Sequence, residues 1–172
     1  IYAQLKKLEH VIFAGFTHEP AVELAERLLK KLPKNQKRIF FSDNGSTAVE
    51  VALKMGFQYW HNKGTPKKKV IAFKNDYHGD TFGAMAVSER GAFSKPFNFG
   101  LLDVIFIDAP VKGKEQESVN QLTSTLNHSR RGSFEQPSTI ASFIFEPIVQ
   151  GVAGMILHEA DALSEMIRIC RK

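Results

Sequence analysis

The 172-residue sequence contains one cysteine and one tryptophan, and no apolar run in it approaches the roughly 18 residues that cross a bilayer. The single cysteine, Cys170, excludes an internal disulfide and is typical of a reducing compartment, so we expect a cytoplasmic protein. The 6 histidines lack the close pairing of a metal site, and one thiol cannot form a thiolate cluster. We therefore predict no metal. With no signal-peptide pattern, we also predict no membrane partner.

Three well-known motifs are also missing. The sequence has neither the G-x-x-x-x-G-K-[ST] phosphate loop nor the G-x-G-x-x-G dinucleotide fingerprint, and it has no G-x-S-x-G elbow for a hydrolase serine. Lysine and arginine outnumber aspartate and glutamate by 23 to 18, a net charge of +5. The basic residues are dispersed except at residues 67–69, where Gly64 and Pro66 precede them and favour a solvated loop. We expect no nucleic-acid partner.

The sequence does contain apolar strands that alternate with helices, and 43% hydrophobic residues suffice for one domain with a sizeable core. Apolar, β-rich runs predict strands at residues 37–41, 69–73, 103–107 and 140–145. Helical spacing predicts helices at residues 1–9, 17–33, 47–60, 81–87, 117–126 and 161–171, with loops at 89–100 and 130–133. This order is typical of an α/β fold with a mostly parallel sheet and helices on both faces. We assign residues 1–33 to a helical segment and residues 34–172 to the sheet-forming domain.

The chain is organised around a small polar turn that joins the first of these strands to a helix. Asn44 and Gly45 tolerate the positive φ of a sharp turn, and Thr47 and Glu50 have the T-x-x-E spacing of a capping box. Free N–H groups and the helix dipole favour an anion there, while Gly45 and Ser46 add close backbone approach and a hydroxyl donor. The turn therefore predicts a phosphate site, although its spacing also allows an ordinary capped helix.

A second polar turn, at residues 75–81, also follows an apolar strand and precedes a helix of small residues. In open α/β sheets ligands bind beyond the carboxyl ends of the strands, so both turns could face one ligand, with the Tyr77 ring on a flat heterocycle. Each residue also has a structural interpretation: Tyr77 as a packed aromatic, His78 as a core histidine and Asp80 as a helix cap. Glu146 ends a buried strand and must have a partner, either a structural hydrogen bond or a ligand.

Three stretches together resemble the class III pyridoxal-phosphate aminotransferases of fold type I. They are residues 41–60, the run Tyr-His-Gly-Asp-Thr-Phe-Gly-Ala-Met at 77–85, and Phe-Glu-Pro-Ile-Val-Gln-Gly at 145–151. Within the family, the turn at 45–50 and the early segment at 10–20 are most similar to the members that act in biotin biosynthesis. The resemblance covers nearly the whole chain. It implies a partial large domain of fold type I, with pyridoxal 5'-phosphate as the cofactor.

The resemblance also implies a reaction and a set of site residues. Gly45 and Ser46 would bind the cofactor phosphate, and Tyr77 would stack on the pyridoxal ring and border the substrate. His78 and Glu146 would support the surroundings of the ring. The implied reaction moves an amino group from S-adenosylmethionine to 8-amino-7-oxononanoate and gives 7,8-diaminononanoate. The implied assembly is a homodimer whose site forms between two subunits.

The resemblance implies no catalytic residue within this chain. In the family, the aspartate that binds the pyridinium nitrogen and the lysine that forms the Schiff base both follow a helix like 161–171, so we expect them beyond Lys172. Because the first residue is Ile1 rather than Met, we also expect the natural N-terminus to be missing. We interpret the chain as an N-terminal part that is inactive alone. Two alternatives stay open: another class III aminotransferase, acting on an ω-amino acid, and a non-enzymatic module that binds a phosphate ligand or a partner.

Overall fold

The structure is a computed structural model that describes residues 1–130 and 139–172. The loop predicted at residues 130–133 lies, apart from Arg130, outside this part of the chain. The chain divides into two compact units, Ile1–Phe41 and Ser42–Lys172, and the second contains the sheet and every candidate site residue. The domain boundary predicted after residue 33 remains a prediction.

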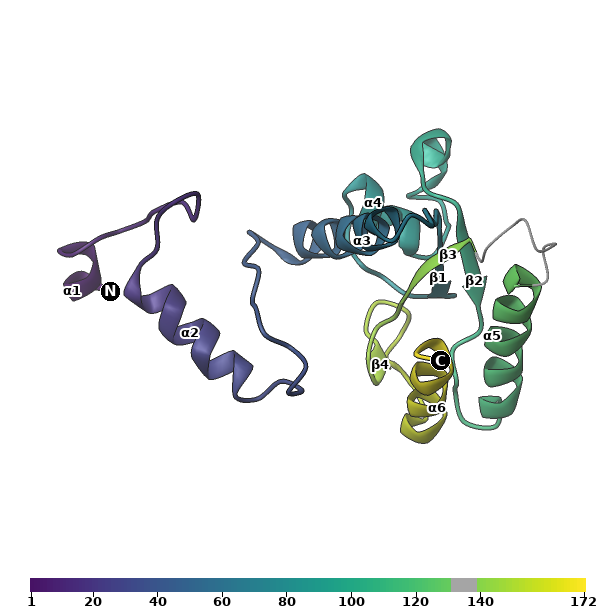
Figure 1. Ribbon diagram of the computed structural model, residues 1–172. Helices are drawn as coiled ribbons and strands as arrows, with labels where there is room; N and C mark the ends of the chain where they lie inside the picture. The colour runs from purple at the N-terminus through teal and green to yellow at the C-terminus, as the bar shows by residue number, and fades with distance from the viewer. Residues whose placement is uncertain (131–138) are drawn as a thin grey trace. The chain divides into compact units, whose positions relative to one another are not determined.

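A three-stranded parallel sheet forms the centre of the second unit (Figure 1). Its strands are β1 (Lys69–Phe73), β2 (Val104–Ile107) and β3 (Ile140–Ile144), in the spatial order β2–β1–β3. The chain passes from β1 to β2 through α4 (Phe82–Val87) and the 3₁₀ helix η1 (Lys95–Gly100), and from β2 to β3 through α5 (Glu115–Arg130). These three predicted strands and the parallel α/β arrangement are confirmed.

Each face of the sheet packs against its own pair of helices. On one face Ile71 and Phe73 pack with α5 and with α6 (Ala160–Cys170). On the other, Val70 and Ala72 pack with α3 (Gly45–Asn62) and α4. Figure 1 shows α3 and α4 together, away from α5 and α6. Burying one large apolar side chain contributes about 1.5–3 kcal/mol, so these two cores hold the strand ends in place.

Helix α3 uses the apolar face that its spacing predicts. Leu53 is buried against the sheet, and the Trp60 indole Nε1 donates a hydrogen bond to the Ala141 carbonyl at 2.8 Å. A Cβ at Gly56 would touch the Ser142 side chain at 3.6 Å, which is ordinary contact. Helix α3 is therefore held against the sheet between Leu53 and Trp60.

The prediction of a strand at residues 37–41 is wrong, because this run does not pair with a neighbouring strand. The first unit contains only α1 (Tyr2–Leu5) and α2 (Glu19–Leu29), and neither helix has a buried residue. Phe41 stacks on Phe13, with ring centroids 5.9 Å apart, but the Phe40 side chain is 65% exposed. A β-rich run becomes a strand only where a neighbouring strand satisfies its backbone groups, and residues 1–41 supply none.

Several element boundaries differ from those predicted. Helix α1 is shorter than the predicted 1–9, and α2 begins after the N-cap His18 as expected but ends at Leu29. The predicted loop at 89–100 contains η1. A two-stranded antiparallel hairpin, β4 (Val149–Gln150) with β5 (Ile156–Leu157), has no counterpart in the prediction, because strands of two residues carry no periodic signal.

Candidate functional site

Helix α3 begins with a side-chain cap. The Asn44 Oδ1 accepts a hydrogen bond from the Thr47 amide at 3.0 Å, and the Asn44 amide donates to the Thr47 hydroxyl at 3.2 Å. The capping box thus joins Asn44 with Thr47, and the box predicted between Thr47 and Glu50 is wrong. The predicted positive φ is also wrong, since Asn44 is extended at φ −160° and Gly45 has no positive φ. An N-cap residue takes extended backbone.

The first two amides of α3, those of Gly45 and Ser46, have no acceptor among the described residues. The space beside Gly45 is open, because a Cβ there would meet nothing within 4 Å. Both amides lie at the positive end of an 18-residue helix. Free N–H groups and the helix dipole at such an end favour a phosphate or another anion.

The Ser46 side chain connects this turn to the second predicted turn. The Asp80 amide donates a hydrogen bond to the Ser46 Oγ at 3.3 Å. Gly79 has φ 126°, and a Cβ there would overlap the Ser46 Oγ and lie 2.8 Å from the Ser46 Cβ. Only glycine fits this contact without displacement. The two predicted turns therefore lie side by side.

Tyr77 lies in the second turn with an exposed ring. Its side chain is 41% exposed, so the packed-aromatic interpretation is wrong. Its hydroxyl donates to the Asp80 Oδ2 at 3.0 Å. The prediction that Asp80 caps α4 is wrong, because the N-cap of α4 is Thr81 and the Asp80 carboxylate binds Tyr77. This hydrogen bond, with desolvation, raises the pKa of Tyr77 above its usual 10.0. The ring face is thus available while the hydroxyl is anchored.

The backbone around Tyr77 is tied to the loop after β3. Glu146 accepts from the Tyr77 amide through Oε2 and from the Gly151 amide through Oε1, each at 3.0 Å. The buried Asp76 accepts from the Gln150 Nε2 at 2.8 Å and from the Glu146 amide at 3.3 Å. Glu146 therefore has the partners that the sequence required. They are backbone amides, which position the turn.

His78, in the same turn, has a buried side chain. Its side chain is 7% exposed, and its Nε2 lies 3.4 Å from the Asp76 Oδ2, within ion-pair distance but without hydrogen-bond alignment. A second buried histidine, His158, packs edge-on against Phe73 at 5.3 Å, and neither of its ring nitrogens has a partner among the described residues. Burial lowers the pKa of His158 below 6.5. Both histidine side chains are therefore buried.

A cavity of about 920 Å³ opens beside Tyr77. Its apolar walls come from helix α4 and from the loops at 88–97 and 151–154; they include Met85, Phe93, Phe97 and Val152. Asp80 and Glu89 also line it. An apolar hollow with a few polar groups is typical of a small-molecule site.

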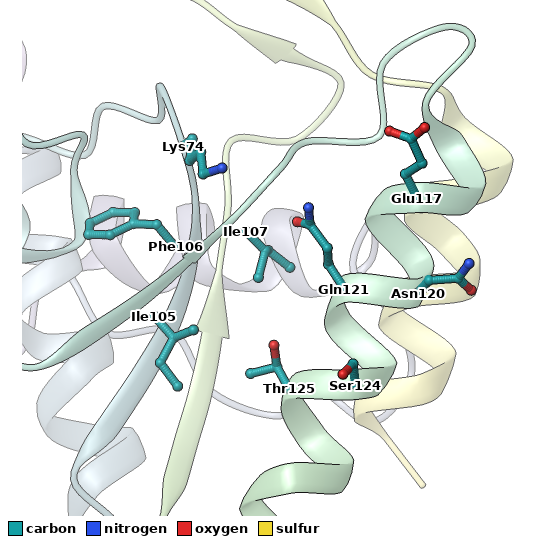
Figure 2. A pocket seen from close by; sticks show the side chains of 9 residues that line it. All are labelled: Lys74, Ile105, Phe106, Ile107, Glu117, Asn120, Gln121, Ser124 and Thr125. Atoms are coloured by element: carbon teal, nitrogen blue, oxygen red, sulfur yellow. The ribbon is translucent and has the colours of Figure 1, made fainter.

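A second hollow, of about 670 Å³, lies between β2 and α5 (Figure 2). Gln121 projects from α5 toward the strand, and Lys74 lies above it. The polar groups here already bind one another: the Lys74 Nζ lies 2.7 Å from the Asp108 Oδ1, and Gln121 bonds both the Asp108 carboxylate and its amide. Those contacts lower the pKa of Asp108. Lys74 and Gln121 therefore already have partners within the protein.

Within residues 1–130 and 139–172, no group of three or more His, Cys, Asp or Glu side chains could hold a metal ion. The helices of the same part of the chain include none that is long and apolar enough to span a membrane.

Three residues that shape the site were not predicted. Asp76 and Gln150 meet only through the fold, and Glu50 was assigned to the wrong partner. The one sequence signal for them was that Asp76 is a charged residue three positions after the end of a buried strand, where burial would require hydrogen-bond partners.

A family model for class III aminotransferases matches residues 1–172. The chain belongs to the class III aminotransferase family. A curated relative, the adenosylmethionine-8-amino-7-oxononanoate aminotransferase of Synechococcus elongatus, is 45% identical over 174 residues. The match covers 96% of this chain and 39% of the relative, so this class III chain spans about two fifths of the relative's length.

Two solved structures of similar chains have the same fold. A crystal structure of the adenosylmethionine-8-amino-7-oxononanoate aminotransferase of Methanocaldococcus jannaschii superimposes with a TM-score of 0.87 at 29% identity, covering 99% of this chain and 37% of that one. An amine transaminase from an uncultivated Pseudomonas species, in its PLP-bound form, gives a TM-score of 0.83 at 31% identity, covering 99% and 40%. The prediction that this chain forms part of a fold type I large domain is confirmed.

The family implies pyridoxal phosphate, and the residues of this class III chain fit that group. The free amides at Gly45 and Ser46 suit a phosphate, and the exposed face of Tyr77 suits a flat ring. Gly79 brings the two turns together where any Cβ would separate them. The two turns thus place unpaired helix amides and an exposed aromatic ring beside each other.

Proposed function

We propose that the intact protein containing this chain is a pyridoxal-phosphate-dependent aminotransferase of biotin biosynthesis. It would transfer the amino group of S-adenosylmethionine to 8-amino-7-oxononanoate and release 7,8-diaminononanoate. The observation that supports the proposal is the contact between the turn at Gly45 and Ser46 and the turn at Tyr77, because it brings unpaired helix amides and an exposed aromatic ring together. The 45% identical relative bears the name of this activity.

Each site residue has a separate role in the proposal. The amides of Gly45 and Ser46 and the Ser46 hydroxyl would hold the cofactor phosphate, and the Tyr77 ring would lie on the pyridine ring. Glu146 would hold the Tyr77 backbone, and His78 would support the turn from the interior. The Tyr77 hydroxyl, whose pKa is raised, would border the substrate. The bound cofactor supplies the electron sink for amino transfer.

The remaining parts of the site would come from outside residues 1–172. We propose that the lysine that binds the cofactor and the acid for its ring nitrogen belong to the rest of the intact protein, so this chain alone would not turn over. The proposed assembly is a homodimer in the cytoplasm. A reducing compartment suits the one cysteine, Cys170, which is free.

The direct test is amine transfer by the purified intact protein, with 7,8-diaminononanoate as the measured product. S-adenosylmethionine should support product formation, whereas alanine and an ω-amino acid should not. Product formation from an ω-amino acid alone would favour the second candidate, an amine transaminase like the 31% identical Pseudomonas relative. Failure to bind pyridoxal phosphate at all would favour a non-enzymatic module.

A further inference from the structure

Helix α4 is capped by a side chain from another helix. The Glu50 Oε1, on α3, accepts hydrogen bonds from the Thr81 hydroxyl at 2.6 Å and from the Gly83 and Ala84 amides at 2.6 and 3.2 Å. The N-cap of α4, Thr81, forms no side-chain cap of its own. Since the first amides of a helix have no partner within it, Glu50 satisfies groups that would otherwise be left unpaired.

The fit around this carboxylate leaves no spare room. A Cβ at Gly83 would overlap the Glu50 Oε2 and lie 2.7 Å from its Cδ. Gly83 and Ala84 are buried, and Glu50 is half-buried. The negative charge also matches the positive end of α4. Glu50 thus joins the two helices through both shape and charge.

Glu50 follows Ser46 by one helical turn, and the two residues hold one continuous segment. Ser46 contacts Gly79 and Asp80, and Glu50 contacts residues 81–84. Two adjacent points on α3 therefore fix the orientation of the turn that carries Tyr77. Neither contact was visible in the sequence, since more than 30 residues separate the partners.

We propose that Glu50 is a positioning residue that holds the Tyr77 turn against the phosphate seat at Gly45 and Ser46. It does not touch the cofactor; it acts through Thr81, Gly83 and Ala84. This inference rests on the proposed cofactor site. Without Glu50, the turn would spend only part of its time in the binding arrangement, and apparent affinity falls by that fraction.

The test compares the intact protein with its Glu50→Ala and Glu50→Gln variants by titration of the apoprotein with pyridoxal phosphate. Glu50→Ala should raise Kd by about tenfold, the factor typical of losing a hydrogen bond to a charged group. Glu50→Gln keeps an acceptor at the same place and should stay within about threefold of the unaltered protein. Trp60→Phe is the matched control, because it removes an α3–β3 hydrogen bond at the other end of α3. It should lower thermal stability without changing Kd.

Hydrogen exchange of the backbone amides gives a second readout that needs no cofactor. Glu50→Ala should speed exchange at residues 79–84, whereas Trp60→Phe should not. If Glu50→Ala fails to fold, Thr81→Val removes one of the three donors and should give the same changes, smaller in size.

Several results would overturn the inference. These are a Glu50→Ala variant with unchanged Kd, a Trp60→Phe variant weakened as much as Glu50→Ala, and tighter binding by Glu50→Gln. If the unaltered protein binds no pyridoxal phosphate, the proposed function fails on its own. Hydrogen exchange at residues 79–84 then tests the role of Glu50 by itself. Faster exchange in Glu50→Ala would support Glu50 as the residue that positions the turn, and unchanged exchange would reject that role.

Discussion

Replacing Gly79 with alanine would test the contact between the two turns most severely. Gly79 has φ 126°, where an L-residue costs about 1–3 kcal/mol. The new Cβ would overlap the Ser46 Oγ and lie 2.8 Å from the Ser46 Cβ, so the turns must separate at a further cost of about 1–3 kcal/mol. We expect a total destabilisation of about 2–6 kcal/mol.

Gly113→Ala separates these two costs. Gly113 also has a positive φ, 83°, but a Cβ there would meet nothing within 4 Å. This control should therefore show the backbone cost alone. The clash is the difference between the two variants, and about 1–3 kcal/mol corresponds to roughly 5- to 150-fold in an equilibrium constant.

The assay is the Kd of the intact protein for pyridoxal phosphate, with thermal unfolding in parallel. Gly79→Ala should weaken binding by roughly 5- to 150-fold, because it moves the Tyr77 ring away from the amides of Gly45 and Ser46. Gly113→Ala should lower the melting temperature and leave Kd unchanged. A Gly79→Ala variant that binds as tightly as Gly113→Ala would refute the idea that both turns hold one ligand.

Substitutions at three further residues address individual side chains. Tyr77→Phe keeps the ring and loses the hydrogen bond to Asp80, so Kd should change by less than about threefold, whereas Tyr77→Ala should raise it by tenfold or more, as measured by titration. Gln150→Ala removes the side-chain donor of the buried Asp76 and leaves it only the Glu146 amide at 3.3 Å, so it should destabilise the protein by about 1–3 kcal/mol in urea unfolding, with the exposed Gln116→Ala as a neutral control. Burial lowers the pKa of His158 below 6.5, so the folded state binds fewer protons than the unfolded one and stability falls as the pH drops below 6.5. His158→Leu should flatten the dependence of melting temperature on pH between about 7 and 5, and an unchanged slope would contradict this account.

Local pattern predicted the sheet well where burial is decisive. The strands at 69–73 and 140–145 are continuous apolar runs covered on both faces, and such runs have few other stable arrangements. The run at 37–41 also ends in β-rich apolar residues, Ile39 to Phe41, yet strand formation depends on a partner strand, and residues 1–41 contain none. Composition identifies a potential strand, but it does not supply the neighbour.

The two polar turns were predictable as candidates because each follows a buried strand or apolar run and precedes a helix. The contacts that these two turns make could not be predicted. Whether Glu50 pairs with Thr47 or with α4 depends on where α4 lies, and the pairing of Asp76 with Gln150 depends on the hairpin after β3. Long-range contacts of this kind have no spacing signal in a single sequence.

The assignment of the phosphate seat to Gly45 and Ser46 is the central claim, and one ratio tests it most directly. The affinity of the intact protein for pyridoxal phosphate is divided by its affinity for pyridoxal, which lacks the phosphate, in Ser46→Ala and in the exposed control Ser164→Ala. We predict that Ser46→Ala lowers this ratio by about tenfold, because one hydroxyl donor to a charged group is lost, and that Ser164→Ala leaves it unchanged. If Ser46→Ala weakens both ligands equally, or neither, the phosphate is not held at this helix N-terminus.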